Sequence, residues 1–261
     1  MFGSLTRVGW QGRAGDYLRG LMLDGRRKSI QPMAARLAGP HEQALNHFVT
    51  NSPWDATAVR QRLAVRMSEA VAPAAWAVDD TGWLKCGTAS VCVARQYTGT
   101  AGKVTNCQIG VSLNLVTDTA SCPVDWRLFV PRSWDDPDSA ATIERRRRAA
   151  MPADAAHQEK WRLGLEMIDE MIGWGVTPPL IVADAGYGDA AEFRQALDDR
   201  DLTWIVGVNC AHTAFTVDTP RTAPPYKGAG RRPPCIYREA APSLKTHILD
   251  AGRDTVRQVT W

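Results

Sequence analysis

One short stretch in the second half of the chain constrains the fold most. The apolar run Leu180–Ala183 is long enough for a buried strand, and it ends abruptly at Asp184. A helical pattern follows at once, with Asp189 in position to cap its first turn. Ligands of open α/β sheets bind at the carboxyl ends of strands. We therefore expect Asp184 at such an end, with Gly186 and Gly188 leaving room beside it.

A second pair of carboxylates follows a similar apolar run. Ala75–Val78 is predicted as a short buried strand, and Asp79 and Asp80 come directly after it. Carboxylate oxygens suit Mg²⁺ or Mn²⁺, and two such ions can support in-line phosphoryl transfer. A divalent-metal site formed by Asp80 and Asp184 is one interpretation. The other is that Asp79 and Asp80 belong to a solvated turn after the strand.

The composition is that of an ordinary globular protein. The chain has 261 residues, of which 44% are hydrophobic and 23% charged, and its net charge of +3 permits a nucleic-acid partner without requiring one. No apolar run approaches the ~18 residues that span a membrane, and the N-terminus lacks the apolar core of a signal peptide. The six cysteines form no CxxC pair, so we interpret them as reduced core thiols of a cytoplasmic protein.

The order of predicted elements indicates the fold class. Residues 12–70 have helical periodicity, and the later segments alternate between strand and helix. The predicted strands are 75–78, 89–95, 107–116, 124–130, 180–183 and 203–208, and the predicted helices after residue 75 are 161–172 and 189–199. A plain hairpin connects the second and third strands through the glycine-rich residues 98–103, and residues 131–156 form a loop or short helix.

This order predicts an α/β fold with a ribonuclease H-like mixed sheet flanked by helices, preceded by a small helical N-terminal domain. We expect three regions: helices in 1–72, the core in 73–210, and the start of an incomplete β-rich insertion in 211–261. After Asn209 prolines and glycines exclude regular helix over much of the segment, and only 236–237 and 256–261 resemble strands.

Two basic clusters are candidate DNA contacts. Arg26, Arg27 and Lys28 lie between the first two predicted helices, where such a cluster is more often a solvated turn. The second cluster is the run Arg145, Arg146, Arg147 and Arg148. It fits either a solvated face or a phosphodiester backbone.

The motifs around both acids resemble a known family. The segments are Ala77-Val78-Asp79-Asp80-Thr81-Gly82, Val93-Ala94-Arg95-Gln96-Tyr97-Thr98-Gly99-Thr100 and Val182-Ala183-Asp184-Ala185-Gly186-Tyr187-Gly188. Together with Leu128-Phe129-Val130-Pro131 and the front end around Tyr17 and Trp54, they are similar to the DDE transposases of the IS701 group, relatives of the IS4 group. The resemblance implies a ribonuclease H-like core that cuts and rejoins insertion-element ends with Mg²⁺ and a D-D-E triad. It also implies double-stranded DNA at terminal repeats as the partner, and a homodimer when full-length.

The resemblance assigns roles to single residues. Asp80 matches the first catalytic aspartate and Asp184 the second, while Asp79 is the structural partner unless the two neighbours exchange roles. The family tyrosine, Tyr187, either packs or stacks near DNA. The basic residues within the matching motifs are further DNA-contact candidates: Lys85, Arg95 and Lys103.

The third acid of the triad has no match. In the family this glutamate lies on a helix beyond a β-rich insertion, and the chain ends within that insertion. None of the other candidates fits the role by its position: Glu166, Glu170, Glu192 and Glu239. We therefore expect a truncated transposase with an incomplete metal site and severely reduced strand cleavage.

Three alternatives remain at this level. A ribonuclease H-like nuclease for RNA–DNA hybrids or Holliday junctions would keep the chemistry and change the substrate. A non-catalytic remnant that binds terminal repeats and represses transposition would keep only the DNA binding. A haloacid-dehalogenase-type phosphatase is disfavoured because its DxDxT order is absent.

Overall fold

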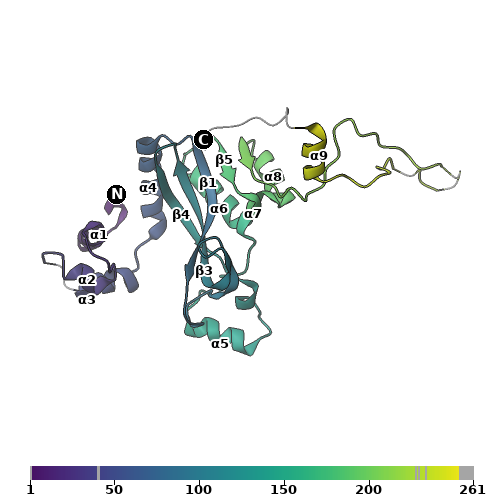
Figure 1. The fold of residues 1–261 in the computed structure, drawn as a ribbon. Coiled ribbons are helices and arrows are strands. Elements are labelled where there is room, and N and C mark those ends of the chain that lie inside the picture. The colour runs from purple at the N-terminus through teal and green to yellow at the C-terminus, as the bar shows by residue number, and fades with distance from the viewer. Residues whose placement is uncertain (1, 40–41, 227, 229, 233, 253–261) are drawn as a thin grey trace. The chain divides into compact units, whose positions relative to one another are not determined.

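A computed structural model of the chain describes residues 2–39, 42–226, 228, 230–232 and 234–252. The chain divides into two units, Met1–Leu180 and Ile181–Trp261, and each is described by itself. Figure 1 shows the elements of both units. The domain boundaries expected from the sequence, after residues 72 and 210, stay a prediction.

Helices form the N-terminal region, as predicted. They are η1 (Phe2–Ser4), α1 (Val8–Met22), α2 (Ile30–Ala34), α3 (Glu42–Thr50) and α4 (Ala56–Val71). Asp55 caps α4, because its carboxylate accepts a hydrogen bond of 2.8 Å from the backbone N–H of Thr57. A small apolar core forms where Phe48 stacks on Trp54 with ring centroids 5.4 Å apart.

An antiparallel sheet occupies the middle of the first unit. Its strands are β1 (Ala75–Leu84), β2 (Ala94–Thr98), β3 (Lys103–Val116) and β4 (Ser121–Leu128). Strand β3 pairs with each of the other three. Its residues Ile109, Val111 and Leu113 are fully buried, and Gly110 and Ser112 between them are buried too, so both faces of this part of the strand are covered. The glycine-rich connection is the plain hairpin expected, since Thr98 pairs with Lys103 across it.

All four antiparallel strands differ in extent from the prediction, and β3 begins at Lys103 instead of residue 107. β1 continues to Leu84 instead of ending at Val78, because every one of its residues pairs with β3. β2 covers 94–98 and not 89–95, since the hairpin sets its register against β3. β4 spans 121–128 rather than 124–130 and includes Pro123, which lies beside a register shift in the pairing with β3.

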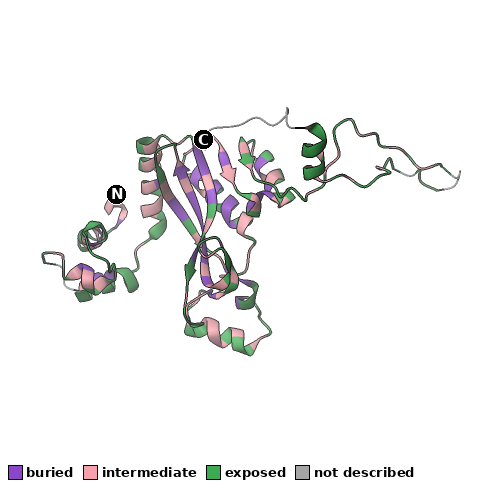
Figure 2. Cartoon of the chain, in the orientation of Figure 1, coloured by how far each residue is buried: buried purple, intermediate pink, exposed green. Residues whose placement is uncertain are grey.

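Helices follow the antiparallel strands along the chain. η2 (Arg132–Trp134) and α5 (Ala140–Arg148) lie within the segment predicted as a loop or short helix. α6 (Lys160–Gly173) matches the predicted amphipathic helix 161–172, and Met167, Ile168 and Met171 are fully buried along it. Figure 2 shows buried residues concentrated in the sheet and α6, whereas α5 has none.

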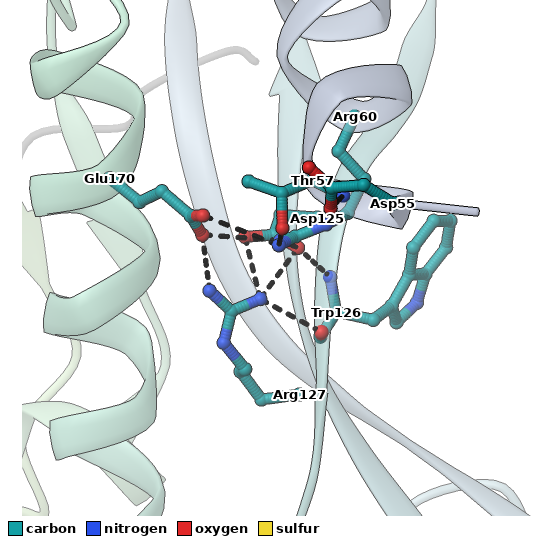
Figure 3. Close-up of polar contacts among 7 residues, drawn as sticks. All are labelled: Asp55, Thr57, Arg60, Asp125, Trp126, Arg127 and Glu170. Atoms are coloured by element: carbon teal, nitrogen blue, oxygen red, sulfur yellow. Dashed lines mark hydrogen bonds and ion pairs between the residues drawn. The ribbon is translucent and has the colours of Figure 1, made fainter. Parts of the chain in front are cut away.

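A buried cluster of charges joins α4, β4 and α6, as Figure 3 shows. The carboxylate of Asp125 on β4 is fully buried and accepts hydrogen bonds from Arg60 on α4 and from Arg127. Glu170 on α6 accepts from the same two guanidinium groups. Two cations thus face two anions, which is how a fold can bury charge. We call these four residues the charge cluster.

The second unit begins with β5 (Ile181–Ala183) and continues through α7 (Ala185–Gly188), α8 (Ala191–Asp198) and β6 (Trp204–Val206). β5 and β6 are parallel. Both strands are somewhat shorter than predicted. α9 (Leu244–Ala251), capped by Ser243, was not predicted, because it follows the proline-rich part of the segment. Ile236 forms only an isolated antiparallel bridge with Thr222, and the predicted strand 256–261 lies outside the described residues.

The fold class is confirmed. Antiparallel β1, β3 and β4 are followed by α6, and then by the parallel pair β5 and β6 with α8 between them in the chain. This is an α/β fold with mixed strands, helices and an N-terminal helical region, in the element order of the ribonuclease H-like plan. Within the described part of the chain, no helix combines the length and apolarity needed to cross a membrane.

The cysteines agree with the expectation only in part. All six are free thiols, and Cys92 and Cys107 are buried, which raises the pKa of both. Cys86, Cys210 and Cys235 are exposed, so the expectation of core thiols is wrong for these three. Cys86 lies in a bend just after the exposed end of β1, and Cys210 and Cys235 lie outside helices and strands.

Candidate active site

Asp80 lies inside β1 and not at its end. Val78, Asp80 and Gly82 alternate onto one face of the strand, and their partners on β3 are Leu113, Val111 and Ile109. Asp79 belongs to the opposite face, and its carboxylate accepts a 2.7 Å hydrogen bond from the backbone N–H of Asp80. The side chain of Asp80 is 21% exposed, so it lies against the core while still open to solvent.

The sequence interpretation missed the ionic partner of Asp80. The ammonium group of Lys160, the first residue of α6, donates to Oδ2 of Asp80 at 2.5 Å. The same nitrogen lies 5.5 Å from the centroid of the Phe129 ring, within cation–π range. The sequence holds one hint of this contact: Gly164 lies one helical turn after Lys160. A residue that small lets a helix approach a strand closely.

Cys107 on β3 faces the same group of charges. Burial is the main cause that raises the pKa of its thiol. The positive charge of Lys160 opposes this rise, and the negative charge of Asp80 adds to it. The thiol is therefore held protonated beside the ion pair, where it acts as a small apolar side chain.

Asp184 lies in the second unit, directly after β5. Its Oδ1 accepts a 2.9 Å hydrogen bond from the backbone N–H of Gly186, so Asp184 caps α7. Asp189, expected as a helix cap, is not one: α8 begins after Ala190, which makes no side-chain cap. Asp184 is exposed, as a ligand at a strand end must be.

The glycines after Asp184 serve two different contacts. A Cβ at Gly186 would lie 3.1 Å from Oδ1 of Asp184, so this glycine does leave room beside the carboxylate. A Cβ at Gly188 would lie 2.0 Å from the carbonyl oxygen of Gly207, so Gly188 is needed for packing and not for a ligand. Tyr187 between them is buried against Phe193, which favours the packing role over DNA stacking.

The four consecutive arginines of α5 divide into two pairs. The guanidinium group of Arg145 lies 3.6 Å from the ring centroid of Trp134, and Arg146 donates to the backbone carbonyls of Trp134, Pro152 and Ala155. Both side chains therefore support the local fold. Arg147 and Arg148 extend into solvent.

Glu144 neutralises part of the positive charge of Arg147 and Arg148. It accepts hydrogen bonds from Arg147 and Arg148 at 2.7–2.8 Å, which lower its pKa from 4.5 to about 2. The contribution of these ion pairs to stability is therefore complete above pH 4.5, and it is lost as the pH falls from there through about 2.

The other basic candidates lie on exposed or partly exposed surface. Arg26, Arg27 and Lys28 connect α1 to α2, as predicted, and all are exposed. Arg95 and Lys103 are exposed on the β2–β3 hairpin, whereas Lys85 at the end of β1 is half-buried.

No set of three or more His, Cys, Asp or Glu side chains that could hold a metal ion occurs within the described residues. Glu170 belongs to the charge cluster, and Glu166, Glu192 and Glu239 are exposed. The donor chemistry at Asp80 and Asp184 nonetheless fits a divalent ion, since both offer hard oxygen ligands and Asp80 already accepts a cation. The two acids belong to different units, so their sharing one ion stays a prediction.

Comparisons with known proteins agree with these motifs. A family model described as DDE superfamily endonuclease matches residues 1–261. A probable transposase for insertion sequence element IS701 from Microchaete diplosiphon is 28% identical over 196 residues, which cover 74% of this chain and 47% of that protein. The chain therefore spans about half the length of this curated relative. Because the family model matches the chain throughout, the protein belongs to the DDE superfamily endonucleases.

Proposed function

We propose that this chain provides the catalytic core of an insertion-element transposase, which cleaves and transfers DNA strands at the element ends. Asp80 and Asp184 would hold the divalent ion, Mg²⁺ or Mn²⁺. When bound, such an ion supplies charge stabilisation and activation of an attacking oxygen in phosphoryl transfer. The chain itself contributes the rigid strand that orients Asp80 and the helix cap that orients Asp184.

One backbone hydrogen bond supports this proposal most strongly. The N–H of Trp76 in β1 donates to the carbonyl of Leu180, directly before β5, at 2.8 Å. Asp80 follows Trp76 at the same spacing at which Asp184 follows Leu180. The two acids therefore lie equally far along the chain from the two groups that this bond joins, and on this ground we propose that they share one ion.

DNA contact is part of the same proposal. The exposed cations Arg26, Arg27, Lys28, Arg95, Lys103, Arg147 and Arg148 are free to approach a phosphate backbone from solvent. Arg145 and Arg146 are not proposed as contacts, because their guanidinium groups support the fold around Trp134.

Iron-directed cleavage of the polypeptide tests the shared site. Fe²⁺ replaces Mg²⁺ at oxygen sites, and with ascorbate and peroxide it cuts the chain close to its ligands. We expect cuts near both residue 80 and residue 184 in the unaltered protein, competed away by Mg²⁺. Asp80→Asn or Asp184→Asn should remove both sets of cuts.

Asp79→Asn is the matched control, since its carboxylate belongs to the opposite face of β1 and the cuts should persist. Cuts near one acid only, or cuts that survive Asp80→Asn, would show that the two acids do not share an ion. In parallel, nicking of supercoiled plasmid that carries the element ends should be slow with Mg²⁺, because the third acid of the triad has no match in the chain, and Asp80→Asn should abolish it. An RNA–DNA hybrid cut in preference to this plasmid would favour the nuclease alternative.

A further inference from the structure

We propose that Lys160 is a built-in counter-cation of Asp80, which occupies the carboxylate when no metal ion is bound and competes with the ion for it. This inference rests on the proposed function, because it takes Asp80 as a metal ligand. It assigns Lys160 a positioning role: the residue keeps the ligand oriented and tunes metal affinity.

The contact is direct and specific. Nζ of Lys160 lies 2.5 Å from Oδ2 of Asp80, and the two side chains are only 30% and 21% exposed. Surface lysines seldom keep such a geometry, because ordering the long side chain costs rotamer entropy. Here the ring of Phe129 lies 5.5 Å from the ammonium group and adds a second favourable contact.

Helix packing fixes the height of Lys160 above the sheet. One turn along α6, a Cβ at Gly164 would lie 2.9 Å from Cγ1 of Val78. Val78 and Asp80 belong to the same face of β1, and Lys160 and Gly164 to the same face of α6. The close approach at Gly164 therefore brings Lys160 onto Asp80.

The position of Lys160 is unfavourable for the helix itself. It is the first residue of α6, where the helix dipole presents positive charge and disfavours a cation. The preceding residue, Glu159, accepts a 2.7 Å hydrogen bond from Arg132. The stability of α6 therefore does not account for a lysine at this position. A partner for the Asp80 carboxylate, which neutralises it until a metal ion binds, does account for it.

Competition between the Lys160 ammonium group and the divalent ion predicts how a substitution of Lys160 changes metal affinity. A divalent ion on Asp80 must displace the ammonium group and then bind close to its positive charge. Removing that charge should tighten metal binding by about tenfold, even with the repulsion screened as in water. A merely structural role predicts the opposite, because a disturbed carboxylate binds metal less well.

The test measures Mn²⁺ affinity by isothermal titration calorimetry and by the paramagnetic resonance signal of free Mn²⁺. Lys160→Met removes the charge and keeps the apolar stem. Lys160→Gln serves as a second neutral variant if the methionine variant does not fold. Lys160→Arg keeps the charge, and Arg132→Met removes a nearby exposed cation that does not contact Asp80.

We expect both neutral variants to bind Mn²⁺ about tenfold more tightly, with Lys160→Arg and Arg132→Met close to the unaltered protein. Unchanged or weaker binding in the neutral variants, with Asp80→Asn still abolishing it, would overturn the role of Lys160 alone. Binding that survives Asp80→Asn, or no binding at millimolar Mn²⁺ in any variant, would overturn the proposed metal site itself.

Discussion

Gly164 is a residue at which α6 lies close against β1, since a Cβ there would meet Cγ1 of Val78 at 2.9 Å. Val78, its neighbour on the strand, is almost fully buried and branched at Cβ, so it has little freedom to move. Gly164→Ala should therefore crowd Val78 and destabilise the protein by about 1–2 kcal/mol, although alanine favours helix. Thermal or urea unfolding measures this change.

Gly12→Ala is the matched control for that substitution. Gly12 lies within α1, and a Cβ there would meet nothing within 4 Å. Alanine at this position should stabilise by up to about 1 kcal/mol, because only the helix propensity changes. In a variant that already carries Val78→Ala, Gly164→Ala should lower the free energy of unfolding by less than it does in the unaltered protein. Equal effects at the two glycines would show that α6 is not held against Val78.

Helix α5 shows that neighbouring arginines of one element have different roles. The replacement of Arg147 and Arg148 by glutamine should weaken binding to DNA and reduce its salt dependence, with thermal stability nearly unchanged. Arg146→Gln should instead lower the thermal stability, because three backbone carbonyls lose their donor. Gel shifts at two salt concentrations and thermal unfolding separate these outcomes. If Arg147 and Arg148 proved silent in the gel shift, α5 would not be a DNA contact.

Local periodicity explains which elements could be predicted. α6 has a long apolar pattern and was predicted nearly to both ends, whereas the apolar pattern of β3 predicted its C-terminal end but missed its first four residues. The second half of β1 was missed because its residues Asp79, Thr81 and Trp83 give no apolar alternation, and only pairing with β3 keeps them extended. α9 was missed because it starts after a proline-rich stretch and buries no residue.

Long-range contacts of the candidate site had no such signal. Asp80 and Asp184 could be chosen from motifs, but Lys160 is distant in sequence from Asp80 and belongs to no motif recognised there. The division of the four arginines likewise depends on Trp134 and on carbonyls of a later loop. Such contacts follow from tertiary packing, which a pattern along the chain does not encode.

At the scale of the first unit, the charge cluster attaches α4 of the N-terminal helices to β4 and α6 (Figure 3). Burial raises the pKa of Asp125, and the guanidinium groups of Arg127 and Arg60 oppose this rise. Burial raises the pKa of Glu170, but the hydrogen bonds and positive charges of Arg127 and Arg60 together outweigh burial, so the net shift of this pKa is downward. Each charge of the cluster compensates another, so the removal of one leaves its partners with an unbalanced charge.

Asp125→Asn should therefore destabilise the protein by about 3 kcal/mol, the lower end of the range for a broken buried pair, because two partly exposed guanidinium groups then share one carboxylate. Arg60→Met should cost less, since Arg127 still pairs with both acids. Its effect should also be local: hydrogen exchange should accelerate in α4 more than in α6. Arg66→Met, which removes the same charge from an exposed position of α4, should change neither quantity. Uniform acceleration of exchange in α4 and α6 by Arg60→Met would show that the cluster does not specifically attach the N-terminal helices to the core.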